Sequence, residues 1–399
     1  MQIRRTNQGF NFHNYPTFEK DIDPKQRAWI EVRGKSIETN VRKLRSKLSK
    51  SCQFMAVVKA DGYGHDAKVV SDYAIKGGAS HLGVATLKEG IRLRSSGVKI
   101  PILILGNLYM KRDLIISFKN DLMPTISSIR ECLICNNIGK HFGLKFSLHL
   151  KVDTGMSRLG FDCNKFVQQF EKIQSFENIS IEGIYSHLSS ADEDNSLDPT
   201  SITQLQRQKF QELLKQINLD RNRNIKIHLA NSAGMLLSKD FHFHMVRVGL
   251  SMYGYSPLTK IDKSLSLKPA LFLKVKVAFI RIIDQGVSVS YGGKFVSSRK
   301  TKIAVLSIGY ADGIPRNLSG KIYVIHNNKL FPQVGSITMD QMMVDITGSN
   351  EIKIGSTVVL IGSDGDKTIS PLDWAKESHT IPWEILCSFK NRLPRVQVD

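Results

Sequence analysis

A lysine that directly follows an apolar run is the residue with the clearest chemical potential in this chain. Lys59 follows five consecutive apolar residues, 54–58, which predict a strand buried on both faces. Gly62 and Gly64 come next and predict a sharp turn into a helix. Burial at a strand end lowers the pKa of a lysine, and Schiff-base chemistry requires the neutral amine. Lys59 is therefore a candidate catalyst, although a lone lysine in such a place more often extends its amine to solvent.

Further polar and ionisable side chains stand at the ends of later predicted strands. They are Lys151, Asp153, His187, His228, Asn231, Ser232 and Arg247. A single histidine or lysine at such a position is usually a satisfied structural group. Several of them, ending different strands, predict one shared site if the strands are parallel and their carboxyl ends meet.

Eight short apolar runs alternate with segments of helical spacing in the first two thirds of the chain. The runs are 54–58, 82–85, 102–105, 122–126, 146–152, 179–186, 225–230 and 245–248. Eight strands, each followed by a helix or loop, predict a (β/α)8 TIM barrel. A doubly wound open sheet is the alternative, but the chain has no glycine-rich GxGxxG turn. In a barrel, the residues named above would converge at the carboxyl-end mouth.

The sequence changes character from about residue 265. Short runs of strand composition predominate, and glycine-rich turns separate them. The predicted strands are 270–283, 302–307, 321–326, 341–346 and 357–361, and residues 371–377 suggest a helix. We therefore predict an N-terminal extension at 1–27, a barrel at 28–264 and an all-β domain at 265–399.

The chain of 399 residues carries a formal net charge of +20. This charge raises nucleic acid or an acidic membrane as partners, but the basic residues are scattered and no nucleic-acid-binding motif is present, so we predict neither. No apolar stretch reaches the roughly 18 residues of a membrane span, and no signal sequence is visible, which predicts a cytoplasmic protein. Cys132 and Cys135 form a lone pair within a helical pattern, so we predict packing there and no metal site.

A cofactor is implied by the combination of these features. Lys59 suits an imine, and the glycine- and serine-rich segments after the seventh and eighth strands occupy the usual phosphate site of a barrel. Several arginines accompany them. Pyridoxal 5'-phosphate fits this pattern, because its aldehyde condenses with a lysine and its ring then accepts electrons from a substrate carbanion.

Short motifs throughout the chain resemble those of the bacterial alanine racemases in order and spacing. In the first domain they are VVKADGYGH at 57–65, KVDTGMSRLG at 151–160, ANS at 230–232 and RVG at 247–249. In the second they are SYG at 290–292, GYADG at 309–313, MDQ at 339–341 and NRLPR at 391–395. The resemblance extends over about 28–395. It implies a homodimer with composite active sites that interconverts L-alanine and D-alanine by a two-base mechanism, supplying D-alanine for peptidoglycan synthesis.

The resemblance also implies the roles of the two bases and of the cofactor ligands. Lys59 would bind pyridoxal phosphate and act as one base, and Tyr291 of a partner subunit would be the opposing base. Arg247 would hydrogen-bond the pyridine nitrogen. The remaining cofactor-binding positions implied are Tyr63, His187, Asn231, Ser232, Gly249, the backbone of Leu250, and Trp383. Trp383 departs from the family, which usually has a tyrosine there whose hydroxyl reaches the phosphate.

The substrate carboxylate would be bound by Arg158 and the backbone of Met339. Lys151 matches a position that is often carbamylated, where the new carboxylate orients Arg158. His228 and Asp340 are implied as supporting residues, with His187 and His228 coupling Tyr291 and Arg247.

Other functions are open to a chain with these motifs. A related racemase acting on serine or on several amino acids is one, and Trp383 keeps it open. A decarboxylase of the same architecture is another, but it would need an acidic residue near the pyridine nitrogen, and Arg247 argues against it. An arginine does not give up its proton, so the ring nitrogen stays unprotonated and the carbanion short-lived, which favours reprotonation. A carrier of pyridoxal phosphate would lack the second domain.

Overall fold

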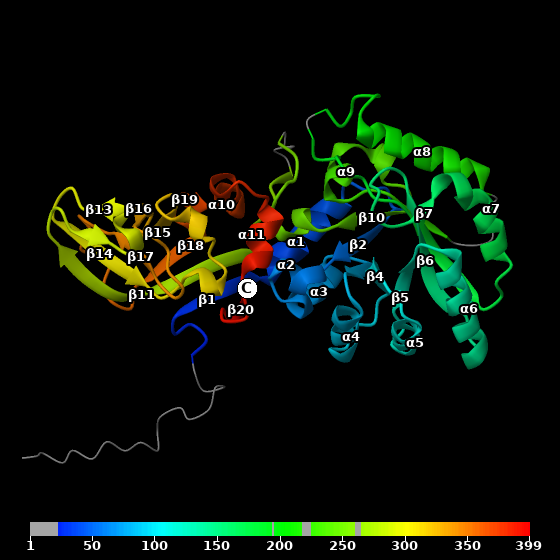
Figure 1. Cartoon of the computed structure of the whole chain (residues 1–399), viewed down its shortest axis with the longest axis horizontal. Helices are drawn as coiled ribbons and strands as arrows, with labels where there is room; N and C mark the ends of the chain where they lie inside the picture. The colour runs from blue at the N-terminus through cyan, green and yellow to red at the C-terminus, as the bar shows by residue number, and fades with distance from the viewer. Residues whose placement is uncertain (1–22, 194, 218–224, 260–264) are drawn as a thin grey trace, which may run out of the picture.

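The computed structural model describes residues 23–193, 195–217, 225–259 and 265–399. Most of the predicted N-terminal extension therefore lies outside the described residues. A barrel with surrounding helices forms one end of the molecule and a β-rich domain forms the other (Figure 1). No helix in the described ranges is long and apolar enough to cross a membrane.

Eight parallel strands close into the predicted barrel. They are β2 (Gln53–Val57), β3 (His81–Val84), β4 (Ile102–Asn107), β5 (Met123–Ile126), β6 (Phe146–Asp153), β8 (Ile179–Tyr185), β9 (Lys226–His228) and β10 (Met245–Val248). The closure comes from the pairing of β2 with β10 at one seam and of β5 with β6 at another. The predicted fold class is thus confirmed. The strands are almost entirely buried because the barrel packs inside and helices cover it outside.

Helices on the outside of the barrel follow most of its strands (Figure 1). They are α3 (Ala67–Lys76), α4 (Leu87–Ser95), α5 (Lys111–Lys119), α6 (Ile129–Phe142), α7 (Cys163–Gln174), α8 (Ile202–Gln216) and α9 (Ser232–Leu237). Helix α1 (Gly34–Arg45) precedes the first barrel strand, and α2 (Lys59–Tyr63) is a short segment at the mouth. Cys132 and Cys135 are buried on α6, in keeping with the predicted packing role. The start of α4 is fixed by a capping box between Thr86 and Glu89.

The second domain is built on one nine-stranded sheet. In spatial order its strands are β19 (Lys367–Ile369), β18 (Thr357–Asp364), β15 (Tyr323–His326), β16 (Lys329–Val334), β17 (Met342–Asp345), β14 (Thr301–Leu306), β11 (Leu271–Ile283), β1 (Ala28–Arg33) and β20 (Arg395–Val398). A small hairpin of β12 (Ser288–Val289) and β13 (Phe295–Val296) stands apart. The predicted all-β character of this domain is confirmed.

Strand β1 belongs to the sheet of the second domain although it precedes the barrel in sequence. It pairs antiparallel with β11, with Ala28 opposite Val275, and parallel with β20. The chain therefore starts in one domain, builds the barrel and returns. The predicted limits of 28–264 and 265–399 remain a prediction of domain extent, and this pairing adds that the first strand after residue 27 lies outside the barrel.

Two helices late in the chain connect the domains. They are α10 (Pro371–Ser378) and α11 (Pro382–Ser388), and both lie between the barrel and the β-sheet (Figure 1). Helix α11 packs against α2, the segment that begins with Lys59. The β-domain thus contributes a wall to the mouth of the barrel.

Candidate active site

A cavity of about 630 Å³ opens at the carboxyl ends of the barrel strands, where a barrel enzyme places its site. Part of its wall comes from α11. The predicted site residues that line it are Lys59, Tyr63, Lys151, Arg158, His187, Asn231, Ser232, Arg247, Gly249, Leu250 and Trp383. Residues separated by more than 300 positions are therefore gathered around one space.

The turn that carries Lys59 has a rare backbone conformation. Ala60, Asp61, Gly62 and Tyr63 have φ angles of 53°, 52°, 63° and 52°, and Gly64 follows at 77°. Five consecutive residues are thus left-handed, which costs about 1–2 kcal/mol for each residue that is not glycine. The glycines relieve part of this strain, and contacts from the rest of the fold must hold the others.

Those contacts come from three directions. The Glu89 carboxylate accepts the backbone N–H of Ala60 at 2.8 Å, and the Asp61 carboxylate accepts that of Ala67 at 3.1 Å. On the β-domain side, Arg395 Nε donates to the carbonyl of Gly64 at 3.1 Å. A Cβ at position 64 would lie 2.4 Å from a backbone oxygen of α11, so only glycine permits this close packing.

The Lys59 amine is prepared for acid–base or covalent chemistry by its surroundings. Burial lowers its pKa, and the positive charge of Arg158 lowers it further. Weaker influences from Cys387 and Glu89 act in the opposite direction. A larger neutral fraction of the amine is therefore present near neutral pH than for an exposed lysine.

One end of the cavity has a small cradle of hydrogen-bonding groups. Ser232 Oγ lies 3.0 Å from the backbone nitrogen of Gly249, and an ideal Cβ on Gly249 would stand only 2.5 Å from Tyr63 Oη. Glycine thus leaves room beside the phenol. Burial raises the pKa of Tyr63, so its hydroxyl remains a donor. The Gly249 N–H donates to Ser232 Oγ, and the Tyr63 hydroxyl takes the place of a Cβ on Gly249, so the two hydroxyl groups lie together in the cavity lining, where hydroxyl donors suit a phosphate.

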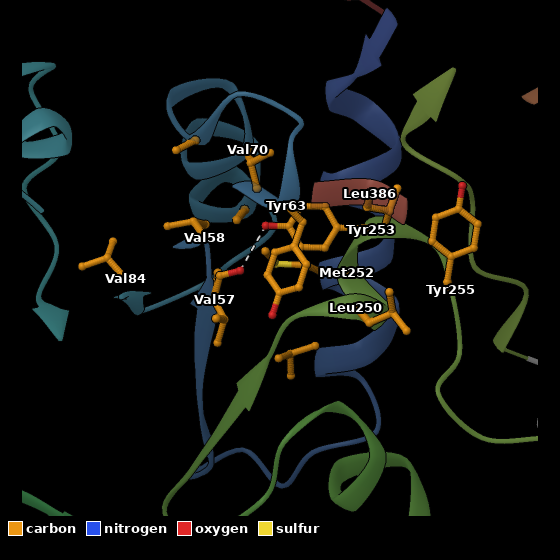
Figure 2. Packing of buried hydrophobic residues seen from close by; sticks show 14 of the residues in the cluster. Val57, Val58, Tyr63, Val70, Val84, Leu250, Met252, Tyr253, Tyr255 and Leu386 are labelled. Atoms are coloured by element: carbon orange, nitrogen blue, oxygen red, sulfur yellow. Dashed lines mark hydrogen bonds between the residues drawn. The ribbon is translucent and has the colours of Figure 1, made fainter. Parts of the chain in front are cut away.

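The Tyr63 ring is held from below by the barrel core. It packs against Tyr253, with ring centroids 4.8 Å apart, and Tyr253 Oη donates to the carbonyl of Val57 at 3.0 Å. Figure 2 shows the two rings side by side between Val57 and Leu386. The phenol is therefore positioned by the same core that carries strand β2.

Arg247 lies at the bottom of the cavity without a carboxylate partner among its hydrogen bonds. Its guanidinium donates to His187 Nδ1 and His228 Nδ1 at 2.9 Å each, and to the carbonyls of Ser186 and Leu229 at 2.8 and 3.0 Å. Burial lowers the pKa of Arg247 to about 10, which leaves it protonated at neutral pH. Arg247 therefore acts as a fixed donor.

Lys151 and Arg158 form another part of the cavity wall. Burial, reinforced by the charges of Arg158 and Arg247, lowers the pKa of Lys151 to about 8. The turn between them is shaped by Asp153, whose Oδ1 accepts the backbone N–H groups of Gly155, Met156 and Ser157 at 2.9–3.1 Å. This wall presents two cationic groups in a region suited to an anion.

The model of the family "Alanine racemase, N-terminal domain" matches residues 32–257, and that of "Alanine racemase, C-terminal domain" matches residues 270–397. This chain belongs to the alanine racemase family. A curated alanine racemase of Prochlorococcus marinus is 50% identical over 377 residues, which cover 94% of this chain and 97% of that protein.

Solved structures of the alanine racemase family agree in fold. The enzyme of Bacillus anthracis with bound L-Ala-P is 35% identical with a TM-score of 0.83, covering 94% of this chain and 95% of that one. The enzyme of Bartonella henselae with covalently bound pyridoxal phosphate is 30% identical, also with a TM-score of 0.83, and covers 93% and 99%.

Three predicted site residues lie away from the cavity of this chain, all in the β-domain. Tyr291 and Met339 have 70% and 53% of their surface exposed, and Asp340 is paired with Arg392 at 2.8 Å. Ser336 Oγ donates to the carbonyl of Tyr291 at 2.9 Å, which ties the loops of Tyr291 and Met339 together. His228 is also outside the cavity lining, because it is buried behind Arg247.

Tyr185 and Cys387 are among the cavity-lining residues that the sequence analysis did not predict. Tyr185 is buried under Arg247, with the guanidinium carbon 5.0 Å from its ring centre, and Cys387 lies on α11. A signal for Tyr185 was present, since it is two residues before His187 and therefore shares its side of an extended chain. Cys387 had no such signal, because only the docking of α11 brings it to the barrel.

Proposed function

We propose that this chain is an alanine racemase that uses pyridoxal phosphate to interconvert L-alanine and D-alanine. The observation that carries the proposal is that one cavity is lined by Lys59, with its lowered pKa, by the donor-only Arg247 and by Ser232 and Gly249. The 50% identity to a curated alanine racemase supports it. The product would serve peptidoglycan synthesis, as in the family generally.

The cofactor would be held by residues that already have suitable geometry. Lys59 Nζ would carry it, Arg247 would donate to its ring nitrogen, and Tyr63, Ser232 and Gly249 would donate to its phosphate. Asn231, the backbone of Leu250 and the indole N–H of Trp383 complete the phosphate end in this proposal. When bound, pyridoxal phosphate withdraws electrons from the substrate Cα, which makes the proton on that carbon removable.

Inversion at Cα requires proton donors on opposite faces. We assign one face to Lys59 Nζ. As the neutral amine it accepts the Cα proton of one enantiomer, and in the reverse reaction it donates a proton to that face as the ammonium. The other face is assigned to Tyr291 Oη, which delivers a proton while Lys59 receives one. Because Tyr291 is exposed and outside this chain's cavity, we assign it to the cavity of a partner subunit in a homodimer.

The substrate carboxylate is assigned to Arg158 and to the backbone N–H of Met339 from the partner. Lys151 is the assigned site of carbamylation, because a pKa of about 8 leaves part of it as the neutral amine that reacts with carbon dioxide. The carbamate would replace one of two adjacent positive charges by a negative one and hold Arg158 in place. Asp340, the residue after Met339, is assigned a supporting role and is paired with Arg392.

A reduction experiment tests the proposal directly. Borohydride should lock pyridoxal phosphate onto the purified chain as a secondary amine, and peptide mass spectrometry should find it on Lys59. The untreated chain should racemise either enantiomer of alanine to an equal mixture, as followed by chiral chromatography. Lys59→Ala should lose both properties. Stoichiometric attachment at another lysine, or no racemisation by a chain loaded with cofactor, would refute the proposal.

A further inference from the structure

A chain of buried ring contacts continues from Arg247 away from the cavity. Arg247 Nη1 is 2.9 Å from His228 Nδ1, and His228 Nε2 is 2.9 Å from Nδ1 of His149. His149 comes from β6 and His228 from β9, the two strands that flank β8 in the barrel, so the contact passes over β8. Both histidines are at most 1% exposed, and His149 is not part of the cavity lining.

Arg247 determines where the protons on these rings must be. A guanidinium has no acceptor, so His228 Nδ1 must contribute its lone pair and carry no proton. A neutral imidazole with a free Nδ1 carries its proton on Nε2, and that proton points at His149. Nδ1 of His149 must therefore accept, which places the proton of His149 on its own Nε2. One charged donor thus fixes the tautomers of two histidines in series.

Both rings remain neutral in this arrangement. Burial and the charge of Arg247 lower the pKa of His228 well below its usual value, with a further contribution from His149. Burial lowers the pKa of His149 to about 3. A second proton on either ring would set two donors against each other inside the barrel, so the direction of the hydrogen bonds has one solution.

The sequence makes room for His149 and fixes the plane of its partner. A Cβ at Gly183 of β8 would lie 2.3 Å from His149 Nδ1, so any residue other than glycine at position 183 would displace the His149 ring. Tyr185, two residues later on the same strand, stacks on His228 with centroids 4.6 Å apart and an angle of 8°. Gly183 and Tyr185 thus define the position and the plane of the two rings.

We propose that His149 is a positioning residue for Arg247. His149 Nδ1 accepts a hydrogen bond from His228 Nε2–H. This hydrogen bond keeps the lone pair of His228 Nδ1 directed at Arg247 and so fixes the orientation of the guanidinium toward the cavity. Only the consequence for the cofactor ring rests on the proposed function. The hydrogen-bond chain itself is a property of these residues and can be tested without any reaction.

Histidine-labelled ¹⁵N NMR of the full chain tests the hydrogen-bond direction, before and after addition of pyridoxal phosphate. We expect His228 Nε2 to be protonated and His149 Nδ1 to be unprotonated, with a scalar coupling between these two nitrogens across the hydrogen bond. A proton on His149 Nδ1, or on His228 Nδ1, would overturn the proposal whether or not the chain is a racemase.

Matched variants test the consequence for the cofactor. His149→Leu removes the acceptor and should weaken pyridoxal phosphate binding about tenfold, the scale of one lost buried hydrogen bond. His149→Asn supplies a short side-chain acceptor and should recover much of this loss. His242→Leu is the control. His242 is also buried, but its ring bonds to the carbonyl of Met235 and takes no part in the hydrogen bonds that join Arg247, His228 and His149. Equal losses in the Leu variants at 149 and 242, or no recovery with Asn, would indicate a merely structural role and refute the proposal.

Discussion

Four cationic side chains face the cavity: Lys59, Lys151, Arg158 and Arg247. Burial destabilises the charged form of both lysines, and the neighbouring positive charges destabilise it further. The pKa values of Lys59 and Lys151 therefore fall. A site of this kind favours anions and neutral amines. Phosphate, carboxylate and carbamate are three anions that the proposed reaction would bring to it.

Our first prediction concerns the division of work between Lys59 and Tyr291. Tyr291→Phe should abolish racemisation in both directions by at least about 10³-fold, because each direction needs one group to take a proton and the other to return one. The α-proton of one enantiomer, D-alanine by family resemblance, should still exchange with solvent through Lys59. Deuterium incorporation measured separately for L- and D-alanine checks this. Equal exchange of both enantiomers would mean that one mobile base serves both faces.

The second prediction uses the pKa of Lys151, which is about 8 in the folded chain and 10.5 for an ordinary lysine. Between these pH values the unfolded chain binds more protons than the folded chain, so the free energy of unfolding increases as pH rises from about 8 to 10.5. Below pH 8 the buried charge of Lys151 destabilises the fold fully. Lys151→Met has no such charge, so its melting temperature should exceed that of the parent most at pH 7, and the difference should shrink by pH 10. Melts without bicarbonate measure it, since carbamylation would mask it.

A third prediction concerns Trp383, which occupies the position of the usual family tyrosine. An indole donates one hydrogen bond but accepts none and is larger than a phenol. Trp383→Tyr should tighten pyridoxal phosphate binding several-fold, and Trp383→Phe should not. Fluorescence titration of the cofactor measures both. The ratio of turnover on alanine and serine in the same variants shows whether the indole also restricts the substrate. If the Trp383→Tyr and Trp383→Phe variants bound the cofactor with equal affinity, the side chain at position 383 would not contact the phosphate.

At the level of elements, the left-handed turn at 60–64 depends on helix α4. Glu89 has two functions there, because one carboxylate oxygen accepts the N–H of Ala60 while the other accepts those of Ala85 and Thr86. One side chain therefore caps a helix and holds the strained turn after β2. The geometry of Lys59 is thus coupled to the start of the second helical unit of the barrel.

Our fourth prediction separates these two functions of Glu89. Glu89→Ala should lower the free energy of unfolding by roughly 1–2 kcal/mol through the lost cap and should also slow attachment of pyridoxal phosphate to Lys59. Asp373→Ala is the matched control, because Asp373 completes the same type of capping box with Ser370 on α10. It should cost similar stability and leave attachment unchanged. Denaturant melts and the rate of cofactor absorbance change give the two readouts, and slowing in both variants would show that stability alone is responsible.

Strand and helix positions in the barrel were predictable because they follow local patterns. The eight apolar runs became its eight strands with ends that differ by at most two residues. Contacts between distant segments were not predictable in this way. β16 was missed because its run, KLFPQV, contains a proline and alternates weakly. β1 was included in the barrel domain because nothing near it in sequence indicates its pairing with β11, which lies in the other domain. The left-handed turn was anticipated only as a sharp bend.

The same distinction holds for the site. Most of the side chains predicted at strand ends line the mouth, since a parallel barrel brings such ends together, but Asp153 and His228 do not line it. Tyr185 was missed although its alternation with His187 was visible, and His149 because it lies in mid-strand. The β-domain positions were known from resemblance alone, and the single chain leaves Tyr291 and Met339 exposed. In the proposed function, a second molecule completes their placement.

At the scale of the whole molecule, that second molecule gives our fifth prediction. If each site combines Lys59 of one subunit with Tyr291 of another, mixing inactive Lys59→Ala and Tyr291→Phe subunits should restore activity. Random exchange makes half of the dimers mixed, and each has one intact site of two, so roughly a quarter of the parent activity should return. Activity after refolding the mixture measures it, and native mass spectrometry verifies the mixed dimers. Verified mixed dimers without activity would exclude shared sites.

The pairing of β1 with β11 has a consequence for the order in which the protein folds during synthesis. Ala28 leaves the ribosome long before Val275, its partner, has been made. The whole barrel can close in that interval, while the apolar strand AWIEVR remains without its sheet. Such a strand is prone to wrong pairing, and chaperones bind segments of this kind. We expect the barrel to mature first and β1 to dock last, so that the wall formed by α11 completes the mouth only after Lys59 is in place.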